Sequence, residues 1–195
     1  MRTRIGLEGL GFTGSGLARP ECVLATRRGD LYVSDRRGGV TRIATDGRQT
    51  LIGGGDLIPN GIALLRDGSF AIANLSDSGG VWRLHADGRI GPEVTEIAGR
   101  RLGSVNFVRT DSQGRLWICV STVRPGDNQF RTDIADGFIA LRDAAGIRVV
   151  ATDICWTNEC WPDEARGLLY VNETYGRRLT RFDMAADGSL SNRVT

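Results

Sequence analysis

GDLYVSDRRGGVTRIATDG, residues 29–47, contains two β-rich runs, each next to a glycine turn, and this pair decides the fold. Runs like the first one return as SFAIAN (69–74), RLWICVS (115–121) and LLYVNE (168–173). These four runs each follow closely on a glycine of one series: Gly29, Gly68, Gly114 and Gly167. A second series follows runs such as GVTRIA (39–44) and GVWRLH (80–85): Gly47, Gly88, Gly146 and Gly188. Val, Ile, Leu and aromatic residues punctuated by Gly and Asp are typical of short strands joined by tight turns.

A unit of roughly 45 residues with four short strands and two glycine turns is typical of a β-propeller blade. We therefore predict an all-β fold, a β-propeller of four-stranded blades, with about four blades in a single domain over residues 1–195. A β-sandwich would not keep two turn series in register, and a solenoid usually has shorter units. No stretch has a sustained helical period.

The composition narrows the possible partners and location. The chain has 195 residues and a net charge of +2, with acidic and basic residues interspersed, so we expect no nucleic-acid partner. No apolar run approaches the length of a membrane span, and we expect no membrane partner. The first residues, MRTRIGLEGL, lack the apolar core of a signal peptide, which predicts a cytoplasmic location. The four cysteines are then expected to be reduced core thiols, and the oligomeric state stays open.

One polar residue stands at a fixed distance before each glycine of the first series. Glu21, Asn60 and Asn106 each precede their glycine by eight residues, and Asn158 precedes Gly167 by nine. Each would open the innermost strand of its blade, and innermost strands line the central axis of a propeller. We therefore expect these four side chains to converge at one mouth of the axis.

A ring of carboxylate and amide oxygens suits a hard divalent cation. Ca²⁺ is the first candidate, with Mg²⁺, Mn²⁺ and Zn²⁺ as alternatives. The competing interpretation is that Asn and Glu simply cap the starts of strands, as Asn often does in turns.

The connections between the second and third strands of each blade open on the same face as this ring. They are SDRRGG (34–39), NLSDSGG (74–80), STVRPGDNQFRTDIADG (121–137) and NETYGR (172–177). The third is polar and much longer than a hairpin loop, which indicates either a loop that covers a substrate or a solvated insertion. We predict that Asn60, Asn106 and Glu173 line a substrate pocket at this face.

Several segments resemble a known family. RPECV, IPNGIAL, VNFVRTDSQGRLWI and TNECWPDEARGLLYVNET resemble the senescence-marker-protein, gluconolactonase and luciferin-regenerating-enzyme family, from about Leu17 to Thr195. The resemblance implies a six-bladed propeller with a divalent metal on the axis and hydrolysis of lactone rings. About four blades fit in 195 residues, so the expected fold is a C-terminally truncated propeller.

The resemblance also implies roles for individual residues. Glu21 and Asn158 match metal ligands of the family, and Asn106 matches an asparagine near the metal and the substrate. The remaining ligand, an aspartate that also acts as the catalytic base, is expected after Thr195, so no catalytic residue is assigned. Ser104 stands where sugar-lactone enzymes have an arginine, which puts aldonolactone specificity in question.

The predicted function is therefore that of a metal-dependent hydrolase that opens a small-molecule lactone by metal-activated water. Two alternatives remain open at this point. One is a non-catalytic propeller that binds a ligand or a partner, because propellers host many functions. The other is a strictosidine-synthase-like propeller, which the segment YVNETYGRRLTRF (170–182) partly resembles.

Overall fold

The computed structural model describes residues 6–195, apart from the side chains of residues 127 and 128. Its strands form four four-stranded antiparallel sheets, each in chain order, and this confirms the predicted blades. The first blade contains β1 (Val23–Ala25), β2 (Leu31–Asp35), β3 (Gly39–Ile43) and β4 (Gln49–Gly53). The second contains β5 (Pro59–Leu64), β6 (Phe70–Asn74), β7 (Val81–Leu84) and β8 (Ile90–Val94). The third contains β11 (Ser104–Thr110), β12 (Leu116–Thr122), β13 (Gly137–Asp143) and β14 (Gly146–Ile154). The fourth contains β15 (Thr157–Asp163), β16 (Leu168–Glu173), β17 (Arg178–Met184) and β18 (Leu190–Val194).

Glycine turns join the first strand to the second, and the third strand to the fourth. In the first blade, Gly29 and Gly47 have φ values of 89° and 82°, in the left-handed region that an L side chain rarely adopts. The amide of Gly29 donates to the Thr26 carbonyl at 3.0 Å, and that of Gly47 to the Ala44 carbonyl at 2.8 Å. These tight turns fix the hairpin register, and both series lie where the sequence predicts them.

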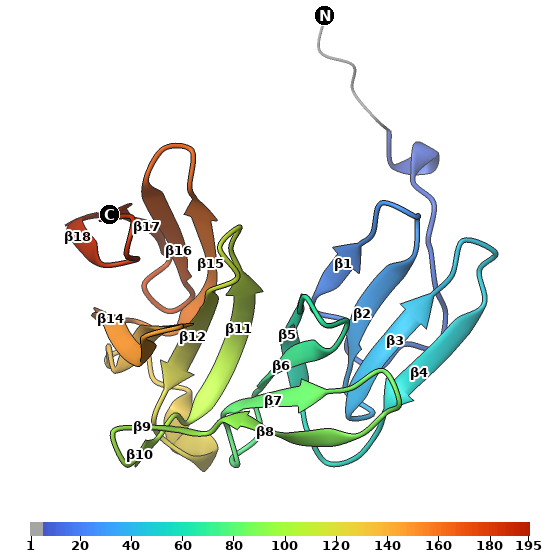
Figure 1. Cartoon of the computed structure of the whole chain (residues 1–195), viewed down its shortest axis with the longest axis horizontal. Coiled ribbons are helices and arrows are strands. Elements are labelled where there is room, and N and C mark those ends of the chain that lie inside the picture. Colours follow the sequence, from blue (N-terminus) through green and yellow to red (C-terminus); the bar gives the residue numbers. More distant parts are fainter. Residues whose placement is uncertain (1–5) are drawn as a thin grey trace, which may run out of the picture.

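The four blades fan around a common axis in an open arc, with the first and fourth blades at its two ends (Figure 1). The first strands of neighbouring blades contact one another, so β1, β5, β11 and β15 are the innermost strands. Smaller elements lie outside the blades: the 3₁₀ helices η1 (Leu7–Gly9) and η2 (Gly126–Gln129), and the hairpin strands β9 (Glu96–Ile97) and β10 (Arg100–Arg101). The β9–β10 hairpin was not predicted from the sequence.

The core lies between the blades rather than within one layer. One cluster of buried apolar side chains joins the first and second blades, another the second and third, and another the third and fourth. All residues of β6 and β12 are buried, because the second and third blades have a neighbour on both faces. This explains why SFAIAN and RLWICVS contain continuous apolar runs instead of alternating ones.

The segment before the first blade packs along that blade. The Ser15 amide donates to the Gln49 side-chain oxygen at 2.8 Å, and the Gln49 side-chain nitrogen donates to the Ser15 carbonyl at 2.8 Å. Further on, the Arg36 amide donates to the Ala18 carbonyl at 2.8 Å, which holds the chain just before Glu21. Within residues 6–195, none of the helices has the length and apolar character needed to cross a membrane.

Candidate functional site

A cavity of about 350 Å³ lies at the axis end where the innermost strands begin. We name it the mouth cavity. Its lining residues are Arg19, Glu21, Arg36, Ile58, Asn60, Leu75, Asn106, Gln129, Phe130, Trp156 and Asn158. All four polar residues at the strand starts are among them, so the structure brings together the residues that the repeat predicted to converge.

A local distortion of the innermost strand directs three of these side chains toward the axis. The pairing register of β5, β11 and β15 shifts near the start of each strand, and the shifts fall around Asn60, Asn106 and Asn158 respectively. Such β-bulges leave a residue without its ladder partner and re-aim its side chain, and they are common beside functional sites. The asparagines therefore face the cavity through a feature that the strand pattern alone does not contain.

Asn60 and Asn106 are coupled directly. The Asn60 side-chain nitrogen donates to the Asn106 side-chain oxygen at 2.8 Å and to the Asn106 carbonyl at 2.9 Å. Both side chains are buried, so this pair fixes the relative position of the second and third blades at the mouth. The Asn106 side-chain oxygen therefore already accepts one hydrogen bond, and its second lone pair remains for another partner.

An arginine that the sequence analysis did not single out completes this side of the ring. The Arg19 guanidinium donates to the Asn60 side-chain oxygen at 2.7 Å and forms an ion pair with the Glu21 carboxylate at 3.1 Å. Arg19 adopts a positive φ of 47°, which is uncommon for a residue with a side chain. The only signal in the sequence is its position two residues before Glu21, in LARPEC.

Asn158 lies across the ring, on the fourth blade. Its side-chain nitrogen donates to the Thr174 hydroxyl at 2.8 Å. Because the nitrogen is used in this way, the carbonyl oxygen is the end of the amide that is available to a cation.

The donor atoms at the mouth cavity are oxygens, which suit a hard cation, but the ligands together carry little negative charge. Carboxylate and amide oxygens come from Glu21, Asn106 and Asn158, and oxygen is the ligand atom that Ca²⁺ and Mg²⁺ prefer. Within the described part of the chain, no three His, Cys, Asp or Glu side chains are grouped as a metal cluster. Glu21 is the one carboxylate among the lining residues, and Arg19 already pairs with it. A cation would therefore compete with the Arg19 guanidinium.

The cysteine next to Glu21 does not belong to this donor set. Cys22 is buried, and burial raises the pKa of its thiol, although the contact with the Ile62 carbonyl partly opposes this effect. The thiol is therefore neutral near pH 7. The described cysteines are all buried and free, which confirms that they are core thiols.

Glu173 is not among the residues that line the mouth cavity, and here the structure corrects the predicted pocket. Its carboxylate is buried and accepts hydrogen bonds from Arg178 and Arg193, both at 2.9 Å, and from the Cys155 amide at 3.0 Å. The Thr180 hydroxyl also donates to it. Burial raises the pKa of Glu173, but the hydrogen bonds together outweigh burial and bring the pKa to about 2. Glu173 is therefore an anion at neutral pH that holds the fourth blade together.

The same arrangement in the first blade shows that this role belongs to the blade repeat. Asp35, at the end of β2, corresponds to Glu173 at the end of β16. Its carboxylate accepts from the Arg37 side chain at 2.6 Å and from the Thr41 hydroxyl at 2.9 Å. The hydrogen bond from the Arg37 side chain is the largest influence on the Asp35 pKa, and it contributes most to lowering that pKa to about 2.

Aromatic side chains form another wall of the mouth cavity. The rings of Phe130 and Trp156 are stacked, with centroids 5.6 Å apart, and Tyr175 lies against Trp156 at 5.0 Å. Phe130 comes from the long connection of the third blade, residues 123–136, so this connection does reach the cavity. The length of this connection predicted either a covering loop or a solvated insertion, and it did not indicate Phe130.

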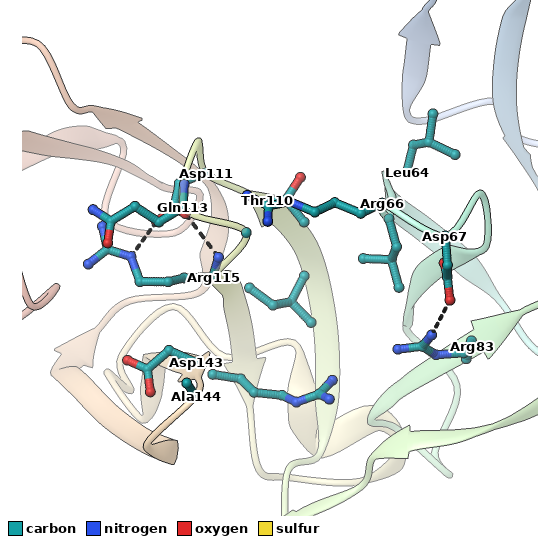
Figure 2. A pocket seen from close by; sticks show the side chains of 14 residues that line it. Leu64, Arg66, Asp67, Arg83, Thr110, Asp111, Gln113, Arg115, Asp143 and Ala144 are labelled. Atoms are coloured by element: carbon teal, nitrogen blue, oxygen red, sulfur yellow. Dashed lines mark hydrogen bonds and ion pairs between the residues drawn. The ribbon is translucent and has the colours of Figure 1, made fainter.

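A second cavity, of about 520 Å³, lies beside the glycine turns of the second and third blades (Figure 2). Several of the charged side chains that line it already form ion pairs with each other. Arg83 pairs with Asp67 at 2.8 Å, and Arg115 pairs with Asp111 at 2.6 Å. We therefore place the candidate site at the mouth cavity.

No protein-family profile matches this chain, and no curated protein matches it. Solved structures do match. A gluconolactonase from Xanthomonas campestris superposes with a TM-score of 0.70 at 24% identity, over 86% of this chain and 58% of that one. A luciferin-regenerating enzyme gives 0.70 at 18% identity, over 91% and 60% of the two chains. A calcium-binding protein, regucalcin, from Agrobacterium tumefaciens gives 0.67 at 19% identity, over 93% and 60%.

These likenesses define the class of fold. The chain has the blade architecture of the gluconolactonase, regucalcin and luciferin-regenerating-enzyme propellers, which confirms the resemblance seen in the sequence at the level of the fold. It spans about three fifths of the length of these structures.

Proposed function

We propose that this propeller belongs to a hydrolase that opens a small lactone ring with the help of a divalent cation held in the mouth cavity. The observation that carries the proposal is the convergence of the Glu21, Asn106 and Asn158 oxygens on one cavity. The fold shared with a gluconolactonase supports the reaction class, and the fold shared with a calcium-binding protein supports Ca²⁺ as the first candidate.

Each residue of the ring has a separate task in this proposal. Glu21 would attract and hold the cation through its charge, and Asn158 would contribute its carbonyl oxygen, because Thr174 occupies its nitrogen. Asn106 would contribute an oxygen that Asn60 orients by hydrogen bonding. A bound cation would supply Lewis acidity, which polarises the lactone carbonyl and lowers the pKa of a water molecule.

The chain's other contributions are positioning and shielding. Asn60 would keep the second and third blades in register at the mouth, and Phe130 would contribute an apolar surface from the side of the long connection. We do not propose any residue of this chain as the catalytic base. The cytoplasmic location likewise stays a prediction.

A second candidate function follows from the Arg19–Glu21 ion pair. A ring whose one carboxylate is already neutralised by an arginine also suits a propeller that binds a small ligand without a metal and without catalysis. Metal affinity distinguishes the two candidates.

Calorimetric titration with CaCl₂ tests the proposal, followed by MgCl₂, MnCl₂ and ZnCl₂. We expect weak binding of one cation per chain, because ligand charge sets much of the affinity of an oxygen site. Glu21→Gln should abolish this binding, and Asn158→Ala should weaken it. Asp46→Asn is the matched control, because it removes one exposed carboxylate in a turn outside the mouth cavity.

The same proteins are then tested in a pH-stat assay with a panel of lactones. Hydrolysis that depends on the added cation and on Glu21 supports the lactonase proposal. If none of the four cations binds, or if Glu21→Gln binds and hydrolyses as the parent does, the metal mechanism is wrong and the ligand-binding candidate takes its place.

A further inference from the structure

The lining of the mouth cavity combines apolar and polar side chains. The stacked rings of Phe130 and Trp156 form its aromatic wall, and Ile58 and Leu75 are also among the lining residues. Pockets for small molecules commonly combine an apolar surface for the body of the ligand with a few polar groups that orient it. The body of the ligand is therefore expected to lie against the aromatic wall.

The ring of Phe130, the outer member of the aromatic wall, is largely exposed to solvent. Trp156 is 9% exposed because Phe130 and Tyr175 cover it, whereas Phe130 is 58% exposed although it lines the cavity. Aromatic rings gain additional stabilisation from a partner ring in stacked or tilted geometry. Phe130 therefore offers an aromatic face to a ligand, and Trp156 acts through Phe130 by supporting it.

The chain holds this wall in place at an energetic cost. Trp156 adopts a φ of 64°, in the left-handed region that a residue with a side chain adopts only at an energetic cost. The loop that carries Phe130 is anchored at several points. The Ser104 hydroxyl donates to the Gln129 side chain at 3.1 Å, and the Cys155 thiol contacts the Ile134 carbonyl at 3.4 Å. The aromatic wall is thus a defined part of the fold.

The charge of the lining favours an anionic group on the ligand. Arg19 and Arg36 line the cavity together with one carboxylate, that of Glu21, which pairs with Arg19. Among the described side chains, Arg36 forms no ion pair. Arg36 is exposed to solvent as well as lining the cavity, and a guanidinium in this position can bind a carboxylate through two hydrogen bonds.

From these two features we propose that the mouth cavity binds a carboxylate whose body is a flat, apolar ring. Its identity as the product of a lactone rests on the proposed function. In that reaction the acyl C–O bond of the ring ester breaks. The oxygen of water joins the carbonyl carbon, and a proton goes to the leaving oxygen, which gives a hydroxy acid. The substrate would then be a lactone fused to an aromatic ring, in place of a polyhydroxylated sugar lactone.

The test compares two hydroxy acids of equal charge, ortho-(hydroxymethyl)benzoate, the hydrolysis product of phthalide, and gluconate. Binding to the chain is measured by calorimetry in the presence of EDTA, so that no metal contributes. We expect the aromatic acid to bind roughly two- to tenfold more tightly, as expected for one additional aromatic contact. Equal binding, tighter binding of gluconate, or no binding of the aromatic acid overturns the proposal.

Variants assign the preference to the wall. Phe130→Ala should remove most of the difference between the two acids, and Phe130→Tyr should keep it. Phe12→Ala, at a fully exposed phenylalanine outside the cavity, is the matched control and should change nothing. Arg36→Gln should weaken both acids by a similar factor, because it changes the charge and leaves the ring contact in place. A preference that survives Phe130→Ala shows that the wall is placed wrongly.

The outcome is separable from that of the proposed function. Aromatic preference in EDTA, together with no binding of any of the four cations, leaves this inference standing and removes the metal-dependent lactonase. Hydrolysis that depends on the cation, with faster turnover of gluconolactone than of phthalide, supports the lactonase and overturns this inference.

Discussion

Replacement of Arg19 by glutamine should increase the affinity of the mouth cavity for Ca²⁺. In the structure, the guanidinium lies 3.1 Å from the Glu21 carboxylate and also binds the Asn60 side-chain oxygen. A divalent cation at the ring must displace this guanidinium or lie close to it. Glutamine keeps a polar amide but ends two bonds before the terminal guanidinium nitrogens, so the change removes the positive charge together with the hydrogen bond to Asn60.

The size of the effect follows from the distance and the exposure. Two unit charges 3.1 Å apart interact by about 1 kcal/mol in a water-like dielectric. Both side chains are about two fifths exposed, and ion pairs of this kind contribute roughly 0.2–1 kcal/mol in practice. Removal of the repulsion between the guanidinium and the divalent cation adds a comparable amount. Together, about 1–2 kcal/mol corresponds to a roughly five- to thirtyfold lower dissociation constant.

The assay is calorimetric titration with CaCl₂ at low and at high ionic strength. Arg28→Gln is the control, because it removes the same charge from an exposed position in a glycine turn at the other end of the first blade. The gain for Arg19→Gln should shrink as salt is added, since salt screens partly exposed charges. If Arg19→Gln binds Ca²⁺ no better than the parent or than Arg28→Gln, the cation does not share the Glu21 site with this guanidinium.

Two further predictions concern single contacts. Glu173→Gln should lower the free energy of unfolding by about 3 kcal/mol at pH 7 in urea denaturation, because a pKa of about 2 in the folded chain against 4.5 in water corresponds to that difference. The depressed pKa makes this contribution complete above pH 4.5 and removes it as the pH falls toward 2, so the parent and the variant should converge in acid; an unchanged gap at pH 2 contradicts the ionic role. Thr174→Val should weaken Ca²⁺ binding roughly two- to tenfold by releasing the Asn158 side chain, as expected for one hydrogen bond; calorimetry on a variant of unchanged thermal stability decides this.

The blades could be predicted from the sequence because their signals are local. Apolar runs and glycine turns lie within a few residues of one another, and each turn by itself fixes the register of a hairpin. The β9–β10 hairpin lacked such a signal. Its turn uses Ala98 at a φ of 50° followed by Gly99, and alanine is not a residue that indicates a left-handed turn. Tertiary context therefore determines this hairpin.

The candidate site was only partly predictable. The spacing before the turn glycines found Asn60, Asn106 and Asn158, because the position of a residue within a repeat is a sequence property. Arg19 was missed because its partner Asn60 is 41 residues away. Phe130 was missed because a long connection has no repeat position from which its direction could be inferred.

The error at Glu173 has a physical cause that applies to the whole fold. Each blade has polar residues at two places near the mouth, at the start of its first strand and at the end of its second. The residues at the second place are Asp35, Asn74, Thr122 and Glu173. In sequence the two sets look alike, since both contain carboxylates and amides next to apolar runs. Both sets also lie at the same end of the blades, because the two strands are antiparallel neighbours.

Hydrogen bonding within the blade separates the two sets. The residues of the second set are hydrogen-bonded within their own blades: Asn74 accepts from the Ile58 and Ser76 amides, and the Thr122 hydroxyl donates to Asp136. The asparagines of the first set line the mouth cavity because bulges in β5, β11 and β15 turn them out of the ladder, although Asn158 also donates to Thr174 of its own blade. A bulge changes which side of the strand a residue faces, and alternation in the sequence does not reveal it. Polar residues at a propeller mouth are therefore site candidates only where the backbone releases them from the blade, and this condition selects Asn60, Asn106 and Asn158 and excludes Glu173.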